Sequence, residues 1–351
     1  MLDYIVVGLG LAGISFCEVL ESEGKSFTVI ADDSQRASLV AGGLYNPVIL
    51  KRFTLAWKAK QQLELVKPFY QNLEEKLGVK VDYDLPVWRK FASVEEQNLW
   101  FEAADRPGLD YFLSTNIHPN TNPAIDALHG FGEVKHTGRV DTHAMVSAYK
   151  NYLEQAGKFI KESFDYDAFS IEEDSVTYKG TVAKKIVFAC GYGLKQDPYF
   201  GYLPLNGTKG ELLVIHATDY QEQHVIKSSV FTIPMENDRY LVGATYKWKD
   251  KTNEPTEASK NELLEKLRTF LQCDFEVVDH VAGIRPTVVD RRPLVGRHPE
   301  HQNLYVLNGF GSRGVLIGPY ASRQLFDYIE NDRELDPEMD IQRFTKKYYA
   351  V

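Results

Sequence analysis

The chain has 351 residues, of which 44% are hydrophobic and 25% are charged, so it is long enough to bury a large core and to form two intertwined domains. Its net charge of −9, without a long Lys/Arg block, argues against nucleic acid as the main partner. Three scattered cysteines argue against a disulfide framework or a zinc site, and no run approaches about 18 apolar residues, so we expect a cytoplasmic protein with no metal and no transmembrane segment.

The N-terminal stretch predicts a nucleotide-binding unit. Residues 4–7 and 27–30 have the character of short buried strands, and residues 14–22 that of a helix. The turn between the first strand and the helix has the spacing G-x-G-x-x-G, and Asp32 and Asp33 follow the second strand. This order is typical of a dinucleotide-binding βαβ unit, in which a carboxylate after the second strand binds ribose hydroxyls.

Each glycine of that turn has a physical task. We expect Gly8 to make the tight turn, Gly10 to let the backbone approach a pyrophosphate, and Gly13 to let the helix pack on the strands. The N–H groups at the helix start, near Leu11 and Ala12, would then face the phosphates. The alternative is a glycine-rich turn that binds no ligand.

The next glycines lie in an apolar turn. Ala41, Gly42 and Gly43 are followed by Asn46-Pro47, a sequence that cannot form regular structure. A surface loop is one interpretation. We favour a turn that lines a ligand, because it directly follows the nucleotide-binding unit and is apolar where a surface loop would be polar.

Helical periodicity runs over residues 55–77 and closes at Gly78, and Pro68 predicts a kink or break within it. A small basic cluster at its start includes Arg52. A solvated helix face explains that cluster, and an anion contact by Arg52 is the alternative.

The following segment mixes strands with an irregular stretch. Residues 79–91 predict strands, and residues 95–104 predict a short helix. Residues 116–132 are rich in Asn, Pro, His and Gly and predict a long loop. Loops of this length in compact proteins often form a rim or lid over a site.

A further strand of the nucleotide sheet is expected later in the chain. A helix begins at Asp141, a plausible N-cap, and ends at Gly157. The apolar residues 185–189 then run into Cys190 and Gly191. Ala189 and Gly191 would therefore lie at the carboxyl edge of the sheet, where ligands bind in such folds.

Residues 204–280 have a different pattern of predicted strands and helices. Residues 212–216, 225–233 and 240–245 predict strands, and residues 256–272 predict one amphipathic helix. This pattern indicates an α+β domain, built on an antiparallel sheet and inserted into the first domain.

The C-terminal part returns the chain to the nucleotide sheet. Residues 304–307 predict a buried strand, residues 309–315 a glycine-rich turn, and Pro319 the start of a last long helix over residues 320–330. We therefore predict an α/β fold with a Rossmann-type nucleotide-binding domain in three segments. Its expected bounds are residues 1–85, 138–203 and 281–351, and those of the second domain are residues 86–137 and 204–280.

Six motifs in this order carry a family resemblance: the Gly8–Gly13 turn, residues 41–47, 138–141 and 189–191, the block 283–296, and residues 309–314. Together they resemble the D-amino-acid oxidase superfamily of FAD-dependent amine and amino-acid oxidoreductases. Within it, the chain is most similar to glycine oxidase and to the FAD domain of the bifunctional enzyme that modifies a wobble uridine in tRNA.

The resemblance implies a non-covalent FAD, with its isoalloxazine ring between the turns at Gly42-Gly43 and Gly309–Val315. Some relatives link the flavin to a cysteine near the latter turn, but this chain has no cysteine after Cys273. The implied cofactor-binding residues are Gly8, Gly10, Leu11, Ala12, Gly13, Asp32, Asp33, Ala41, Gly42, Gly43, Ala189, Gly191, Gly309, Gly311, Ser312, Arg313, Gly314 and Val315.

The resemblance also implies that Arg285 holds the carboxylate of a small amino acid or N-substituted amino acid. A planar guanidinium can bind a carboxylate bidentately and so fix the Cα–H over the flavin. Hydride transfer from Cα to flavin N5 would give an imine that water hydrolyses, so no catalytic acid–base pair is needed. The alternative role for Arg285 is a structural ion pair. His298 and His301 are expected at the surface and are not nominated.

Two departures from the family pattern concern the site. Ala31 stands where the ribose-binding acid is usual, so Asp32, Asp33 or neither makes that contact. Phe231 stands where glycine oxidase offers a tyrosine hydroxyl to the carboxylate, which favours a bulkier or more apolar substrate. Tyr246 and Tyr240 are the candidates to replace that hydroxyl.

Three other functions remain as alternatives. The Gly311–Gly314 turn favours a stand-alone tRNA-modifying flavoenzyme, but a pI of about 5.6 and the lack of a methyltransferase domain speak against it. The others are a flavin-binding subunit without turnover of its own and a nicotinamide-dependent dehydrogenase.

Overall fold

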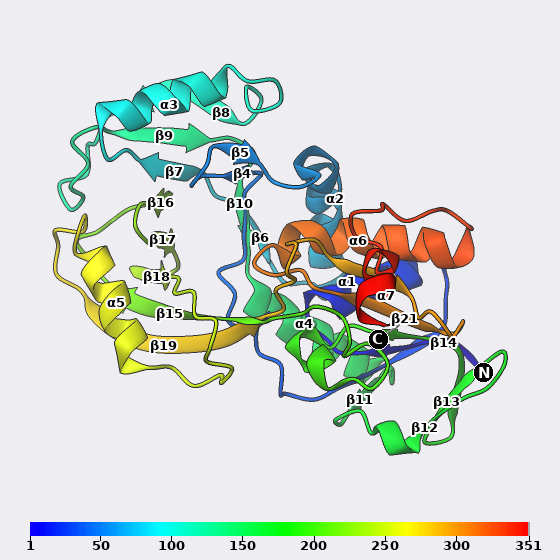
Figure 1. The fold of residues 1–351 in the computed structure, drawn as a ribbon. Coiled ribbons are helices and arrows are strands. Elements are labelled where there is room, and N and C mark those ends of the chain that lie inside the picture. The colour runs from blue at the N-terminus through cyan, green and yellow to red at the C-terminus, as the bar shows by residue number, and fades with distance from the viewer. Residues whose placement is uncertain (350–351) are drawn as a thin grey trace.

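The computed structural model describes residues 1–349. Two large sheets lie in separate lobes of the molecule, and the chain passes between the lobes several times (Figure 1). The α/β fold class with a second, largely antiparallel sheet, in which only β7 (Val87–Lys90) and β16 (Val225–Lys227), among the described strands, pair in parallel, is therefore confirmed. The exact residue bounds of the two domains stay a prediction, and the boundary proposed at residue 280 falls inside a strand that continues to Arg285.

The first sheet, here called the parallel sheet, carries the N-terminal unit. Its strands are β1 (Leu2–Val7), β2 (Phe27–Ala31), β11 (Phe159–Lys161), β12 (Phe169–Ile171), β13 (Val176–Tyr178), β14 (Thr181–Phe188), β20 (Leu294–Arg297) and β21 (Leu304–Asn308). β11, β2, β1, β14 and β21 are neighbours in that order and run parallel. Three distant segments of the chain thus form one sheet, and the carboxyl ends of its parallel strands share one edge.

Helices enclose the parallel sheet. They are α1 (Leu11–Ser22), α2 (Ala59–Leu77), α4 (Thr142–Gln155), α6 (Gly314–Glu330) and α7 (Gln342–Tyr348), with the short turns η1 (Tyr166–Ala168) and η2 (Gly191–Gln196). α1, α2, α4 and α6 share one hydrophobic core with one face of the sheet (Figure 1). A second core, rich in Phe and Tyr, lies on the other face. Burial on both faces explains the apolar runs at residues 4–7 of β1 and 186–188 of β14.

The second sheet, here called the antiparallel sheet, follows the order β19-β15-β18-β17-β16-β7-β9-β8. Its strands are β7 (Val87–Lys90), β8 (Leu113–His118), β9 (Phe131–Val134), β15 (Thr208–His216), β16 (Val225–Lys227), β17 (Phe231–Pro234), β18 (Arg239–Gly243) and β19 (Glu276–Arg285). α3 (Val94–Ala104) and α5 (Glu257–Leu267) contribute to the cores on its two opposite faces. β19 is long and carries its last residue, Arg285, toward the parallel sheet.

Short strands connect the two lobes. β3 (Leu44–Tyr45), β10 (Gly138–Val140) and β6 (Asp82–Asp84) form a three-stranded sheet, and β4 (Val48–Ile49) pairs with β5 (Thr54–Leu55). Asp141 then caps α4, since its side chain accepts a hydrogen bond from the Ala144 N–H, as predicted. No helix within residues 1–349 is long and apolar enough to cross a bilayer.

The last long helix begins five residues earlier than predicted, at Gly314, with Pro319 inside it. A proline lacks the N–H that would bond the carbonyl four residues back. That carbonyl, of Val315, instead accepts a hydrogen bond of 3.0 Å from the Tyr70 hydroxyl. A contact from α2 thus satisfies the group that made Pro319 resemble a helix start. α2 likewise continues through Pro68, so of the predicted kink or break the helix shows no break, and a kink stays a prediction.

The structure corrects other predicted elements. The predicted loop over residues 116–132 is in part regular, because β8 and β9 pair across it. Asn120 and Asn122 hold the turn between them, donating to or accepting from the backbone of Ile125 and Ala124. The helix predicted over residues 256–272 ends at Leu267, and the one predicted from residue 55 starts at Ala59.

Candidate functional site

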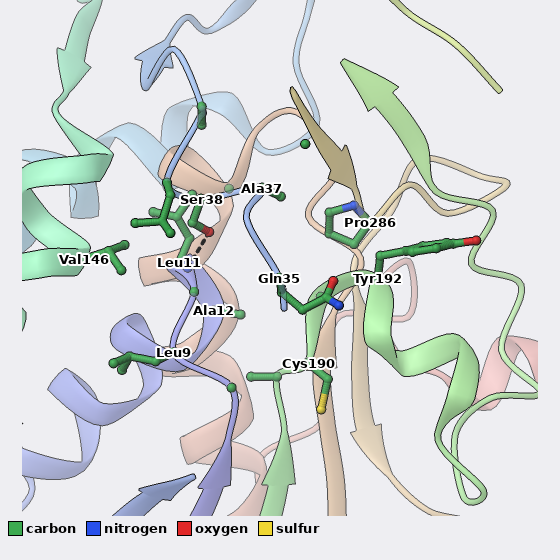
Figure 2. Close-up of a pocket in the computed structure, with 18 of the residues that line it drawn as sticks. Leu9, Leu11, Ala12, Gln35, Ala37, Ser38, Val146, Cys190, Tyr192 and Pro286 are labelled. Atoms are coloured by element: carbon green, nitrogen blue, oxygen red, sulfur yellow. Dashed lines mark hydrogen bonds between the residues drawn. The ribbon is translucent and has the colours of Figure 1, made fainter. Parts of the chain in front are cut away.

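A cavity of about 930 Å³ lies between the two sheets. It runs from the β1–α1 turn, at the carboxyl edge of the parallel sheet, to Arg285 and Phe231 of the antiparallel sheet. Figure 2 shows Leu11 and Ala12 on one side of it, and Tyr192 and Pro286 on the other. None of residues 116–132 lines this cavity, so the predicted rim or lid does not lie here.

Backbone geometry at the β1–α1 turn requires its glycines. Gly8 has a φ of +105°, and a Cβ built on it would lie 2.5 Å from the carbonyl oxygen of Ala189. A Cβ on Gly13 would lie 2.0 Å from the carbonyl oxygen of Gly8, so α1 packs against the turn without room for a side chain. Gly8, Gly10, Leu11 and Ala12 line the cavity, whereas Gly13 lies behind it.

Two helix N-termini open toward the cavity. α1 follows Gly10 and α6 follows Arg313, and neither residue caps its helix with a side chain. The Leu11 N–H donates to Ser38 Oγ at 3.0 Å, the hydrogen bond drawn in Figure 2. Gly314 and Val315, the first residues of α6, also line the cavity. Apart from the Leu11 N–H, the first N–H groups of such helix N-termini have no intrahelical acceptor, and they carry partial positive charge, which suits an anionic ligand.

The two acids after β2 both line the cavity but have different partners. The Asp32 carboxylate accepts hydrogen bonds from the Ser163 hydroxyl at 2.5 Å and from the Ser34 N–H at 3.0 Å. Burial raises the pKa of Asp32, but these hydrogen bonds outweigh it and lower the pKa overall. Asp33 instead pairs with Lys161 at 2.9 Å and with Lys150 at 3.3 Å, which lowers its pKa.

Arg285 lies at the opposite end of the cavity. Its Nη1 donates to the Thr245 carbonyl oxygen at 3.3 Å, and its guanidinium lies 4.8 Å from the ring centroid of Tyr246. No carboxylate within residues 1–349 forms an ion pair with it. The alternative of a structural ion pair is therefore not supported, and N–H groups of a half-buried guanidinium remain available. Burial lowers the pKa of Arg285, and Tyr246 opposes that shift.

Residues 3–328 match the model of the DAO family, described as FAD dependent oxidoreductase. The chain belongs to this family. Glycine oxidase of Bacillus subtilis (strain 168) is 23% identical over 347 residues, covering 94% of this chain and 93% of that protein. The solved structure of glycine oxidase from Bacillus cereus ATCC 14579 superposes with a TM-score of 0.76 at 21% identity, covering 95% of this chain and 96% of that one.

A bifunctional relative is also similar. The tRNA 5-methylaminomethyl-2-thiouridine biosynthesis bifunctional protein MnmC of Burkholderia pseudomallei (strain 1106a) is 23% identical over 397 residues. The match covers 97% of this chain but 59% of MnmC. The predicted resemblance to the DAO superfamily is thus confirmed, and the chain is an enzyme of an FAD-dependent family of amino-acid oxidases and dehydrogenases.

The DAO family implies FAD, and the cavity fits it. The glycine turn, the two uncapped helix N-termini and the acids after β2 all face one elongated cavity. Of the remaining predicted cofactor-binding residues, Ala41, Gly42, Gly43, Ala189, Gly191, Gly311 and Ser312 line this cavity. Gly309 and Arg313 do not line it: Gly309 packs against Val288 and Leu294, and Arg313 precedes α6.

The predicted substrate-binding residues of this DAO-family chain have different positions. Phe231 lines the cavity, and Tyr246 lies beside it with its ring over Arg285. Tyr240 is buried in the antiparallel sheet, where its hydroxyl accepts the Glu222 N–H, so it cannot replace the missing hydroxyl. Arg52 is exposed and does not line the cavity, and its anion contact is not supported.

Sequence reasoning missed Gly210 of β15. A Cβ on this residue would lie 2.0 Å from an Nη atom of Arg285, so glycine provides the space in which the guanidinium lies. Gly210 is the cross-strand partner of Gly283, which precedes Arg285 on the same face by two residues. It also missed Gln35, Ser38, His143, Lys150 and Ser163, which line the cofactor end and belong to no motif.

His298 corrects another expectation, because it is buried rather than exposed. Its Nδ1 accepts hydrogen bonds from the N–H groups of Glu300 and His301, both at 3.2 Å. Burial lowers the pKa of His298 to about 4, so the ring is neutral at pH 7. The histidine holds a turn and does not line the cavity.

Proposed function

We propose that this chain oxidises the C–N bond of a small amino acid or N-substituted amino acid, using non-covalently bound FAD. The observation that supports it is an arginine without an ion-pair partner, Arg285, in the same cavity as the β1–α1 turn. FAD, when bound, supplies the two-electron acceptor that such an oxidation requires.

The substrate end has the groups that binding requires. Arg285 can bind the substrate carboxylate bidentately and orient the rest of the molecule. Leu212, Phe231 and Ala244 supply apolar walls that exclude water around the carbon to be oxidised. A phenyl ring at residue 231 offers no hydroxyl to the carboxylate, which favours substrates larger or more apolar than glycine.

The proposal that FAD is bound non-covalently is supported by the surroundings of the three cysteines. Cys190 lines the cavity, but its Sγ donates to the Val7 carbonyl oxygen at 3.6 Å, and burial raises its pKa well above the usual value. A protonated, hydrogen-bonded thiol is a poor nucleophile. Cys17 lies on α1 and is buried in the core beneath the parallel sheet, and Cys273 is partly buried against a core of the antiparallel sheet. FAD should therefore leave the protein on denaturation and pass a filter that retains the chain.

The decisive experiment is an absorption spectrum of the purified protein, followed by anaerobic addition of glycine, sarcosine and a panel of D- and L-amino acids. We expect a yellow protein whose flavin band, near roughly 450 nm, is bleached by at least one of them. Admitting air then tests whether oxygen reoxidises it. A yellow protein that no amino acid bleaches would contradict the proposal while leaving the family assignment intact.

A second candidate is oxidative cleavage of a tRNA wobble-uridine side chain. Tyr246 and Trp248 are 41% and 47% exposed beside the cavity, and Lys249 between Trp248 and Asp250 is also exposed. Aromatic and cationic side chains of this kind stack on unpaired bases. Salt-dependent retention on heparin and binding of unmodified tRNA would support it. An unretained protein that is bleached by a free amino acid would exclude it.

A further inference from the structure

Two arginines meet at one exposed tyrosine beside the substrate end. The guanidinium carbon of Arg285 lies 4.8 Å from the ring centroid of Tyr246, and that of Arg291 lies 5.8 Å from it. Arg291 Nη1 also donates to the Tyr246 hydroxyl at 3.0 Å, and its guanidinium lies 5.1 Å from the ring of Trp248. Tyr246 thus contacts both Arg285, which lines the cavity, and Arg291, which is exposed and lies outside the cavity lining.

Neither arginine has an anionic partner among residues 1–349, although acids are close in the chain. Asp290, the residue before Arg291, pairs with Arg343 at 2.9 Å. Glu338 pairs with Arg292, the residue after it, also at 2.9 Å. The chain has 49 acidic and 40 basic residues, so acids outnumber bases. Even so, in the part of the chain that the structure describes, the residues on either side of Arg291 form ion pairs and Arg291 does not. Two unpaired guanidinium groups at one ring repel each other until an anion joins them.

The backbone holds this arrangement in place. Arg291 has a φ of +62°, a left-handed conformation that is costly for a residue with a side chain. Tyr246 precedes a segment tied to β15: Lys209 and Lys247 exchange two backbone hydrogen bonds, and the fully buried Lys209 Nζ donates to Asp250 at 2.6 Å. The rim is therefore pre-organised, which reduces the entropy lost when a ligand binds.

We propose that Arg291 and Tyr246 form a second anion subsite, and that the preferred substrate is an amino acid with a second carboxylate. This inference rests on the proposed function, in which Arg285 binds the first carboxylate. The second acid is carried either by the side chain or by the substituent on nitrogen. Both guanidinium carbons lie within 6 Å of the centroid of the Tyr246 ring. In a bidentate pair, the guanidinium carbon and the carboxyl carbon are about 4 Å apart. One diacid with about 5 Å between its carboxyl carbons is therefore long enough to bridge Arg285 and Arg291.

Kinetics of the holoenzyme test the proposal with matched substrates. D- and L-aspartate and glutamate represent a side-chain acid, iminodiacetate represents an N-linked acid, and alanine, glycine and sarcosine carry one carboxylate. We expect kcat/KM to be at least about tenfold higher for one class of diacid than for the monoacids. Arg291→Ala should abolish that advantage, so that the ratio of the diacid kcat/KM to the monoacid kcat/KM falls toward one. Arg297→Ala, at an exposed arginine at the end of β20, is the control and should change neither.

A binding measurement decides the proposal independently of turnover. Titration calorimetry of the holoenzyme should show succinate binding at least about tenfold more tightly than propionate, with the difference lost in Arg291→Ala and reduced in Tyr246→Phe. Equal affinities, or a preference for succinate that survives Arg291→Ala, would overturn the subsite. If no amino acid reduces the flavin, the proposed function fails, and the succinate titration still decides whether the subsite exists.

Discussion

The two ends of the cavity are built in different ways. At the cofactor end, backbone atoms form the surface: a glycine turn, two helix N-termini, and acids already paired with serines and lysines of the chain. At the substrate end, side chains from β15, β17 and β19 form the surface, and the cations lack partners. At the cofactor end, backbone N–H groups at helix N-termini would hold an anionic group, whereas at the substrate end an unpaired side-chain cation would do so.

The difference also bears on stability. The acids of the cofactor end, Asp32 and Asp33, contribute to folding before any ligand arrives, because their hydrogen bonds and ion pairs are already made. The guanidinium of Arg285 is half-buried without a counter-ion, an arrangement that costs free energy in the free protein. We therefore expect substitutions at the cofactor end to affect folding and FAD content, and substitutions at the substrate end to affect mainly substrate binding and turnover.

The largest effect is expected at Arg285. Arg285→Ala should retain FAD but lose about 2–5 kcal/mol of substrate interaction, equivalent to roughly 30- to 5,000-fold in kcat/KM. Steady-state kinetics and the flavin absorbance of the purified variant measure the two properties. Arg52→Ala is the matched control, because Arg52 is exposed and lies outside the cavity. An Arg285→Ala enzyme with unchanged kcat and KM would remove the carboxylate role.

The next effect separates backbone strain from steric collision at the cofactor end. Gly8 and Gly24 both have a positive φ, +105° and +66°, but a Cβ on Gly24 meets no atom within 4 Å. Gly24→Ala should cost about 1 kcal/mol of unfolding free energy. Gly8→Ala should cost about 1–3 kcal/mol more, because its methyl collides with backbone of Ala189, and should lower the FAD content. Thermal unfolding and flavin absorbance measure both, and equal losses would contradict the collision.

A smaller effect is expected at Gly210. The methyl group of Gly210→Ala would displace the Arg285 guanidinium, which a Cβ approaches to 2.0 Å. We expect KM for the amino acid to rise about tenfold, roughly 1.4 kcal/mol, with FAD content unchanged. This variant tests the substrate end separately from the cofactor end, because it displaces the Arg285 guanidinium without removing its charge. Loss of FAD from Gly210→Ala would show that the two ends are coupled.

The smallest expected effect is on the pH dependence of stability, and it comes from His298, which lies outside both ends of the cavity. The pKa of His298 is about 4 in the folded chain, against 6.5 for a free histidine. Between these values the unfolded chain binds more protons, so stability falls as pH falls. His298 should account for about 1 kcal/mol of the loss between pH 6.5 and 5.5. Denaturant unfolding of His298→Gln at the two pH values should show a smaller loss than the wild type. Identical losses would contradict this role.

The sequence by itself determined the parts that depend on local backbone chemistry. The G-x-G-x-x-G spacing, the apolar strands and the Asp141 cap predicted β1, α1, β2, β14 and the start of α4, because glycine conformation, burial on both faces and capping act within a few residues. The order of predicted strands and helices indicated the fold class and the second sheet, and the family resemblance implied the role of Arg285.

The tertiary structure alone decided what distant segments do for one another. Pro319 lies within α6 because Tyr70 reaches the carbonyl of Val315, and His298 is buried because aromatic side chains from other segments, such as Phe200, pack around it. Gly210 makes room for a side chain 75 positions later in the chain. Arg291 and Tyr246 meet only when the antiparallel sheet has formed. Such contacts depend on the relative placement of whole strands and helices, which no local pattern encodes.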